Sequence, residues 1–184
     1  QEAVTAKMGD DEESTYIVEY LDEPAGPVEP GWISRAGKAR VTYPNGNVFE
    51  GNFNEDKRKE GDGKYTWSSN AEADDEDEGA PKIVPVYEGQ YSNGKRHGKG
   101  KMLYPNGDTY QGEWENDKMN GEGTYIYFTA KGEADVFSGT WVSGVKQGVG
   151  TYEFGVDKSQ LVGNWEAGAI VDGSWRFPDG GSYE

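Results

Sequence analysis

The sequence contains no cysteine, so it can form neither disulfide bonds nor thiolate metal sites, which is compatible with a reducing compartment. It contains one histidine, His97, and no serine or aspartate in a recognisable nucleophile or metal-binding motif. No apolar run approaches the roughly 20 residues that a membrane-spanning helix requires. We therefore predict a protein that is not an enzyme, with no catalytic residues, no cofactor and no metal.

Basic residues are also scarce, and the formal net charge is -16. Residues 10–29 contain eight acids and residues 72–78 contain six, without a lysine or arginine in either segment. We predict an acidic, partly extended or disordered N-terminal segment at 1–31 and an acidic loop insertion at 68–85. The run at 72–78 lacks the glycine of a calcium loop, which favours a solvated insertion over a calcium site. The charge argues against nucleic acid and against an anionic membrane as partners.

Glycine and aromatic residues, in contrast, are abundant, and they recur in register. The chain has 28 glycines, about twice the share of an average protein, and 13% aromatic residues. The pattern aromatic-x-Gly-x-aromatic occurs at 49–53, 87–91, 110–114 and 137–141, and with leucine first at 161–165. A Gly-x-Gly pair follows at 61/63, 98/100, 121/123 and 148/150. Successive motifs are 23, 27 and 24 residues apart, and 38 apart across the acidic insertion.

The aromatic residues have period two, which predicts that they share one face of a β-strand. We expect the glycine between them to face the opposite way and to let a ring or a backbone lie close. Polar residues at 114–118 predict a tight turn between two strands. The segments 43–46, 104–107 and 177–180 contain Pro-Asn-Gly or Pro-Asp-Gly, which predicts a second turn class with a left-handed glycine.

Both ends of the repeated region depart from the pattern. The first unit has Ala39 where a second glycine is expected, and the fifth unit, around Gly173, lacks the full Gly-x-Gly and is one residue short. Terminal repeats of an array are commonly irregular. We therefore expect a distorted fifth unit, followed by the start of a sixth.

The combination of aromatic-x-Gly-x-aromatic and Gly-x-Gly-x-Tyr at about 23 residues resembles the MORN repeat (membrane occupation and recognition nexus) over residues 37–184. This resemblance implies an all-β fold, in which successive antiparallel β-hairpins form one elongated, twisted sheet. The residues that define the repeats are Gly51, Gly89, Gly112, Gly139, Gly163, Tyr91, Trp114, Trp141 and Trp165.

Within that family, the strings at 91–100, 104–110 and 139–144 and the acidic N-terminal segment resemble the radial spoke head MORN proteins of motile cilia and flagella. The resemblance implies a structural scaffold subunit of the axoneme that contributes to motility. Its partners would be other radial spoke head proteins, with homo- or hetero-association of MORN arrays. MORN repeats also occur in junctophilins and plant phosphatidylinositol-phosphate kinases, so a phosphoinositide- or membrane-associated module that regulates an enzyme or a junctional complex stays open.

A group of basic residues lies where the hairpin tips are predicted. The group comprises Lys57, Arg58, Lys59, Lys95, Arg96 and Lys118. We call it the basic ridge and expect it to line up along the tips, either as solvated turn residues or as a docking edge for an acidic partner. His97 is interpreted as a surface turn residue. The string at 98–101 lacks the spacing of a phosphate-binding loop, so its glycines are assigned to hairpin geometry.

The aromatic residues of one face form a row that a single sheet cannot bury completely, because it has no second layer. The row comprises Tyr87, Tyr91, Trp114, Tyr125, Trp141, Tyr152 and Trp165. We expect these rings to stack on one another and on the glycines. The alternative is a concave aromatic surface for a partner strand or peptide.

Overall fold

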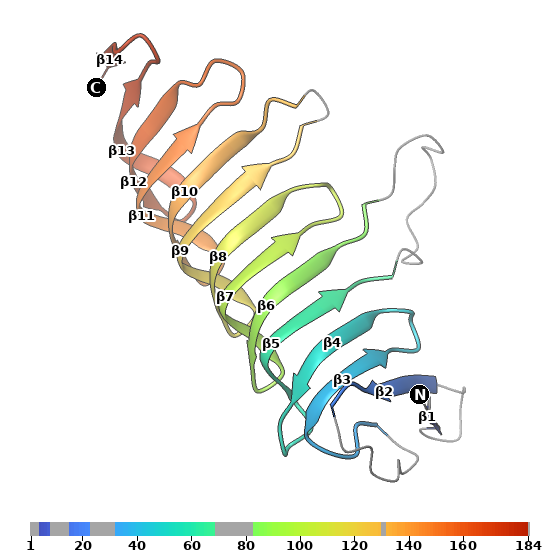
Figure 1. Ribbon diagram of the computed structural model, residues 1–184. Coiled ribbons are helices and arrows are strands. Elements are labelled where there is room, and N and C mark those ends of the chain that lie inside the picture. Colours follow the sequence, from blue (N-terminus) through green and yellow to red (C-terminus); the bar gives the residue numbers. More distant parts are fainter. Residues whose placement is uncertain (1–3, 8–14, 23–31, 69–82, 130–131, 184) are drawn as a thin grey trace. The chain divides into compact units, whose positions relative to one another are not determined.

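The computed structural model describes residues 4–7, 15–22, 32–68, 83–129 and 132–183, and every regular element in these ranges is a β-strand (Figure 1). The chain divides into two compact units, Gln1–Lys95 and Arg96–Glu184. Most of the acidic insertion predicted at 68–85 and most of the acidic N-terminal segment lie outside the described residues. The predictions of disorder for them therefore stay predictions.

The first unit contains six strands, each antiparallel to the next in chain order. They are β1 (Val4–Lys7), β2 (Thr15–Tyr20), β3 (Gly37–Thr42), β4 (Val48–Phe53), β5 (Lys59–Thr66) and β6 (Val86–Ser92). β1 and β2 fall within the segment 1–31, and β2 pairs with β3 at the start of the predicted repeat region.

The second unit continues the same arrangement from β7 onward, with each strand again antiparallel to the next (Figure 1). Its strands are β7 (Lys95–Leu103), β8 (Thr109–Glu115), β9 (Lys118–Tyr127), β10 (Asp135–Val142), β11 (Val145–Glu153), β12 (Gln160–Glu166), β13 (Ala169–Arg176) and β14 (Ser182–Tyr183). The predicted all-β array of antiparallel hairpins is confirmed.

A row of glycines crosses the second unit at right angles to its strands. Each of β7 to β13 contributes one glycine directly opposite its neighbours: Gly100, Gly112, Gly123, Gly139, Gly150, Gly163 and Gly173. In the first unit the row consists of Ala39, Gly51, Gly63 and Gly89. Ala39 therefore occupies a glycine position of the array.

These glycines lie on the same face as the rings, and the prediction that they face away was wrong. Phe49, Gly51 and Phe53 are two residues apart in β4, and residues at that spacing share a face of a strand. A Cβ atom added to Gly51 would lie 2.6 Å from Cζ of Phe49. The related prediction, that glycine lets a ring lie close to the sheet, is confirmed.

Within the described ranges, the rings bury one another although no second layer of strands or helices covers them. Tyr110 is fully buried, and its ring meets Trp114 at 5.1 Å and Trp141 at 5.5 Å, both in edge-to-face geometry. The indole Nε1 of Trp114 donates to the Gly100 carbonyl at 3.2 Å, and that of Trp141 donates to the Gly123 carbonyl at 3.3 Å. Edge-to-face contacts of this kind are favourable beyond the area that they bury.

The burial is not uniform along the aromatic row. Tyr87, Tyr91, Trp114, Trp141 and Trp165 are buried, whereas Tyr125 and Tyr152 are half-buried. The expectation that a single sheet leaves part of this row accessible is confirmed for those two tyrosines.

The two glycines of each Gly-x-Gly pair have different roles. Gly148 has a left-handed φ of 71°. It lies opposite Thr140 at a β-bulge of β11, where the register with β10 shifts. Gly150 then joins the glycine row. The fifth unit has one residue fewer at this place, and Gly173 still pairs with Gly163. Its irregularity is therefore confined to the bulge.

The tight turns share one backbone geometry, with positive φ at their two central residues. Asn116 and Asp117 have φ values of 49° and 69°, and Ser143 and Gly144 have values of 51° and 88°. Positive φ at both central residues is the type I′ geometry, which matches the twist of paired strands. The predicted Pro-Asn-Gly turn is confirmed at Gly107, which has a φ of 88° and donates to the Tyr104 carbonyl at 3.0 Å.

Candidate interaction surfaces

The basic ridge predicted from the sequence divides into two groups of side chains. Lys57, Arg58, Lys95 and Lys118 are exposed at the hairpin tips. Lys59 and Arg96 are half-buried, and each contacts aromatic rings. Only the first group is available to a partner.

Lys57 and Lys118 both stand four residues after the second aromatic residue of their motifs, but they do not occupy equivalent positions in their hairpins. Lys118 directly precedes Met119, which lies opposite Trp114, and Arg58 directly precedes Lys59, which lies opposite Phe53. Arg58 is therefore the equivalent of Lys118, and Lys57 lies within the turn with a φ of 60°. The alignment failed because the turn between β4 and β5 is one residue longer than the turn between β8 and β9.

Lys59 enters a cage of four aromatic rings in the first unit. Its Nζ lies 4.4 Å from the ring centroid of Tyr65, 5.0 Å from that of Phe49, 5.5 Å from that of Tyr43 and 5.7 Å from that of Tyr91. Such distances suit attraction between a cation and the negative ring faces. Lys59 is thus part of the packing.

Lys146 occupies a second cage of the same kind in the second unit. Its Nζ lies 4.6 Å from the Phe137 centroid, 4.9 Å from that of Trp165, and 5.1 Å and 5.2 Å from those of Tyr152 and Tyr127. Burial lowers the pKa of Lys146. Sequence reasoning missed this residue, although its place two residues after the turn at Gly144 and five residues beyond Trp141 is the signal that would have found it.

Arg96 fastens β7 to the turn between β8 and β9. Its guanidinium lies 4.5 Å from the ring centroid of Trp114, and its Nη2 donates to the Asp117 carbonyl at 2.9 Å. The Arg96 backbone N–H and Nε both donate to the Asp117 carboxylate, at 3.0 and 3.2 Å. The charge of Arg96 is therefore already paired within the chain.

A polar clamp recurs where one hairpin passes to the next. Oδ2 of Asp108 accepts the Tyr125 hydroxyl at 2.8 Å, and its Oδ1 accepts the Phe128 N–H at 2.7 Å. In the same way, Oδ2 of Asp135 accepts the Tyr152 hydroxyl at 2.8 Å, and its Oδ1 accepts the Gly155 N–H at 2.7 Å. These carboxylates connect segments that are 17 to 20 residues apart in sequence.

The first unit has the amide version of this clamp. Oδ1 of Asn47 accepts the Ser68 N–H at 2.7 Å, and its Nδ2 donates to the Tyr65 hydroxyl at 2.9 Å. An asparagine can replace the aspartate in this clamp because a tyrosine hydroxyl can donate a hydrogen bond to a carboxylate and can also accept one from an amide N–H.

The tyrosines of the ring face resist ionisation. Burial raises the pKa of Tyr43, Tyr110, Tyr125 and Tyr152. For Tyr125, the hydrogen bond to Asp108 raises the pKa further, because a carboxylate stabilises the protonated phenol. The rings therefore remain neutral well above pH 7.

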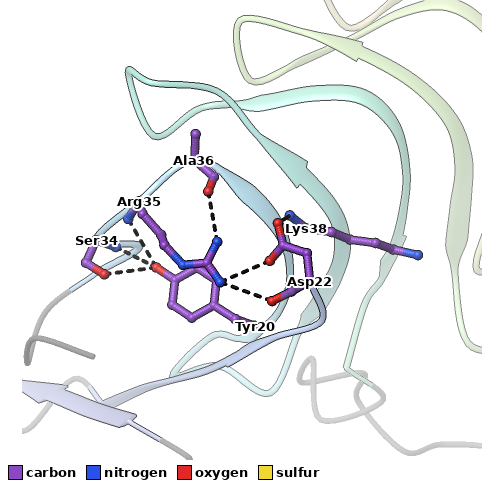
Figure 2. Close-up of polar contacts among 6 residues, drawn as sticks. All are labelled: Tyr20, Asp22, Ser34, Arg35, Ala36 and Lys38. Atoms are coloured by element: carbon purple, nitrogen blue, oxygen red, sulfur yellow. Dashed lines mark hydrogen bonds and ion pairs between the residues drawn. The ribbon is translucent and has the colours of Figure 1, made fainter. Parts of the chain in front are cut away.

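A network of polar contacts fixes the segment that precedes β3 (Figure 2). The Tyr20 hydroxyl oxygen accepts the N–H groups of Ser34 and Arg35 at 2.8 and 3.2 Å. The Arg35 guanidinium lies 4.2 Å from the Tyr20 ring centroid and forms an ion pair with Asp22 at 3.1 Å. Asp22 also accepts the Lys38 N–H at 3.1 Å.

Burial alone would raise the pKa of Asp22, but the hydrogen bonds from Lys38 and Arg35 outweigh it and lower this pKa. The network holds Trp32 and the fully buried Ile33 against the first unit. The Trp32 ring lies 5.0 Å from Tyr16 and 6.0 Å from Phe53. Sequence reasoning missed this contribution to the core, which depends on partners far along the chain.

Each unit has a second face, opposite the glycines and rings, which we call the ring-free face. In the first unit, one row of this face alternates in charge across β2 to β6: Glu19, Arg40, Glu50, Lys64 and Glu88. Arg40 and Glu50 form an ion pair at 2.7 Å. The corresponding row of the second unit is uncharged from β8 to β13: Gln111, Thr124, Ser138, Thr151, Val162 and Ser174.

The remaining candidate residues have structural positions. His97 is exposed in strand β7, so its assignment to a turn was wrong. Gly98 has a left-handed φ of 60°, and Gly100 belongs to the glycine row. Within the described ranges, no three His, Asp or Glu side chains converge as metal ligands, and none of the regular elements is a helix that could cross a membrane.

These features together define a repeat protein built from β-hairpins, in which the hairpins of each unit pack their rings on one face of the strands. A model of the MORN repeat family matches residues 49–72, 87–109, 110–129 and 137–156, and the chain therefore contains MORN repeats. A comparison with curated proteins gave no match. The hairpin of β12 and β13 lies beyond these matches but has the same pairing of Gly163 with Gly173.

Proposed function

We propose that the chain is a non-enzymatic scaffold subunit of the radial spoke head in motile cilia or flagella, similar to radial spoke head protein 1 and radial spoke protein 10. The MORN repeats support a module for protein–protein or membrane contact. The radial spoke assignment is supported by the strings at 91–100 and 104–110, which form the end of β6, most of β7 and the turn into β8.

The observation that carries the scaffold role is the internal use of the aromatic face. The rings pack on the glycine row and on one another, and Lys59 and Lys146 fill the cages between them. The surfaces that remain are the ring-free faces and the turns, which recur at the regular spacing of the strands. Regular, rigid surfaces of this kind suit several simultaneous protein contacts.

The partners in this proposal are other radial spoke head proteins and further MORN arrays, at the axoneme on the cytoplasmic side. Neither a cofactor nor nucleic acid takes part. A formal charge of -16 steers the protein away from phosphate backbones and toward basic protein surfaces.

A phosphoinositide-binding module is the second candidate, and the exposed tip residues Lys57, Arg58, Lys95 and Lys118 favour it. Acids share the same turns, however, because Asp56 precedes Lys57 and Asp117 precedes Lys118. Attraction to an anionic membrane needs clusters of several uncompensated basic residues. The scaffold is therefore the better supported function.

Two measurements test the proposal. The tagged chain, expressed in ciliated cells, is expected to co-purify with radial spoke subunits after the axonemes are extracted with salt. The purified chain is expected to stay in the supernatant when phosphoinositide vesicles are sedimented at physiological salt. Sedimentation with the vesicles that is lost on changing the four tip residues to alanine, but kept in the Lys64→Ala control, would establish the membrane module instead.

A further inference from the structure

The ring-free face of the second unit contains a nearly uncharged area on β9 to β12. Thr124, Ser138, Thr151 and Val162 lie side by side in one row, and the hydroxyls of Thr124 and Ser138 are 3.0 Å apart. In the first unit, the corresponding row alternates between acidic and basic residues and is internally neutralised. The two ring-free faces therefore offer different chemistry.

Aliphatic side chains extend this uncharged area on both sides of the hydroxyl row. Val149 is 72% exposed, Val142 is 50% exposed and Ile126 is 39% exposed. Val142 lies opposite Val145, which is 42% exposed, at the tip of the β10–β11 hairpin. Exposed β-branched residues grouped on one sheet face are suited to covering by another protein surface.

We propose that the ring-free face of β9 to β12 binds a second copy of this chain, around a twofold axis that runs parallel to the strands between β10 and β11. The proposal specifies one association of MORN arrays within the scaffold function, but it does not depend on the assignment to the radial spoke. The surface comprises three rows. Two are in register throughout: Thr124, Ser138, Thr151 and Val162; Ile126, Val136, Glu153 and Gln160. The third joins the pair Glu122 and Thr140 to the pair Val149 and Asn164 across the bulge between β10 and β11.

The register makes this surface complementary to itself. A twofold axis parallel to the strands places β9 over β12 and β10 over β11 of the second copy, row on row. Ser138 then faces Thr151, and hydroxyl groups both donate and accept hydrogen bonds. Thr140 faces Val149 of the second copy, so methyl groups meet.

The charges of the surface also fit this arrangement. Its two carboxylates, Glu122 and Glu153, lie in different rows, so neither faces an acid across the axis. Glu122 faces Asn164, whose amide can donate to it, and Glu153 faces Val136. Because the chain carries a net charge of -16, a surface without facing acids is where two copies can approach each other.

The size of the surface sets the expected strength. Four strands about 4.8 Å apart and three rows about 6.8 Å apart cover roughly 400 Å² per copy. A total of about 800 Å² falls in the range of weak, transient interfaces. We therefore expect association in the high-micromolar range that strengthens with salt, as screening reduces the repulsion between two acidic chains.

Sedimentation equilibrium of the full chain over a range of concentrations tests the proposal. A monomer–dimer equilibrium is expected, and Val149→Glu is expected to raise the dissociation constant at least tenfold. Val156→Glu is the matched control, because Val156 is 79% exposed in the β11–β12 turn, outside the surface, and receives the same charge. Circular dichroism verifies that both variants are folded.

A second pair of variants tests the twofold geometry. Asn164→Lys is expected to tighten the dimer severalfold, since the lysine faces Glu122 of the second copy, whereas Asn164→Glu is expected to weaken it. Val156→Lys controls for the change in net charge. A chain that stays monomeric at every concentration, or a dimer that Val149→Glu weakens no more than Val156→Glu, overturns the proposal. A dimer that Asn164→Lys tightens no more than Val156→Lys overturns the twofold arrangement.

Discussion

Gly112 and Gly123 lie directly opposite each other on β8 and β9, and the Tyr110 ring covers both. A Cβ atom added to Gly112 would lie 2.5 Å from the Cα atom of Gly123 and 2.5 Å from the Tyr110 hydroxyl. Neither the strand nor the buried ring can move away without disturbing its own neighbours. Absence of a side chain is therefore the condition for the ring to lie on the sheet.

Gly112→Ala is accordingly expected to destabilise the protein by about 2 to 3 kcal/mol, as overpacking of a tight core does. Urea denaturation followed by tryptophan fluorescence measures the change. Gly181→Ala is the control, since Gly181 is exposed and an added Cβ would lie 3.1 Å from Oδ1 of Asp179 and 3.6 Å from Cδ2 of Phe177, with no backbone atom among its nearest neighbours. Equal destabilisation by the two variants would contradict the proposed reason for the glycine row.

Gly148 and Gly150 separate the backbone requirement from the steric one. An added Cβ at Gly148 has no neighbour nearer than 3.9 Å, but the residue has a φ of 71°. Gly148→Ala should therefore cost about 1 to 2 kcal/mol, the penalty of a left-handed alanine.

Gly148→Asn should cost less than Gly148→Ala, because asparagine tolerates this conformation. Gly150→Ala should cost more, because its Cβ would lie 2.7 Å from the Phe137 ring. Thermal unfolding measured by circular dichroism ranks the three variants. An asparagine variant less stable than the alanine variant would show that the left-handed backbone is not what matters at Gly148.

The clamp at Asp108 predicts that alanine and asparagine have different effects. Asp108→Ala leaves the Tyr125 hydroxyl and the Phe128 N–H without their acceptor and should cost about 2 to 3 kcal/mol. Asp108→Asn should cost less than about 1 kcal/mol, because Asn47 already forms this clamp in the first unit. Chemical denaturation compares the two. Similar losses for both variants would mean that the negative charge matters more than the hydrogen bonds.

The tyrosines of the ring face predict alkaline unfolding. Their pKa values are raised in the folded state, first by burial, so above pH 10 the folded chain binds more protons than the unfolded chain. This part of the stability is complete below the ordinary tyrosine pKa of about 10 and is lost as the pH rises above it. Melting temperatures and tyrosinate absorbance between neutral pH and pH 12 should show the two changes together. Tyr125→Phe should reduce the dependence on pH.

The repeat pattern was sufficient to predict the fold class. The spacing of aromatic residues and glycines predicts hairpins, and the Pro-Asn-Gly string predicts the left-handed conformation of Gly107, because these are properties of a few neighbouring residues. The same spacing misplaced Lys57, since one extra residue in the turn between β4 and β5 shifts the alignment. A local pattern does not reveal how many residues a turn contains.

The positions that connect distant strands were not accessible in this way. Asp108 meets Tyr125, Lys146 enters a cage made by rings from four strands, and Trp32 packs on Phe53, all through pairings that bulges and turn lengths set. The amino-acid sequence by itself determined which residues alternate along each strand and where hairpins turn, because those depend on local geometry. Only the tertiary structure decided which residues form rows across the strands. The register of each strand pair depends on bulges, on turn lengths and on contacts with the neighbouring strand, and a local pattern does not contain these.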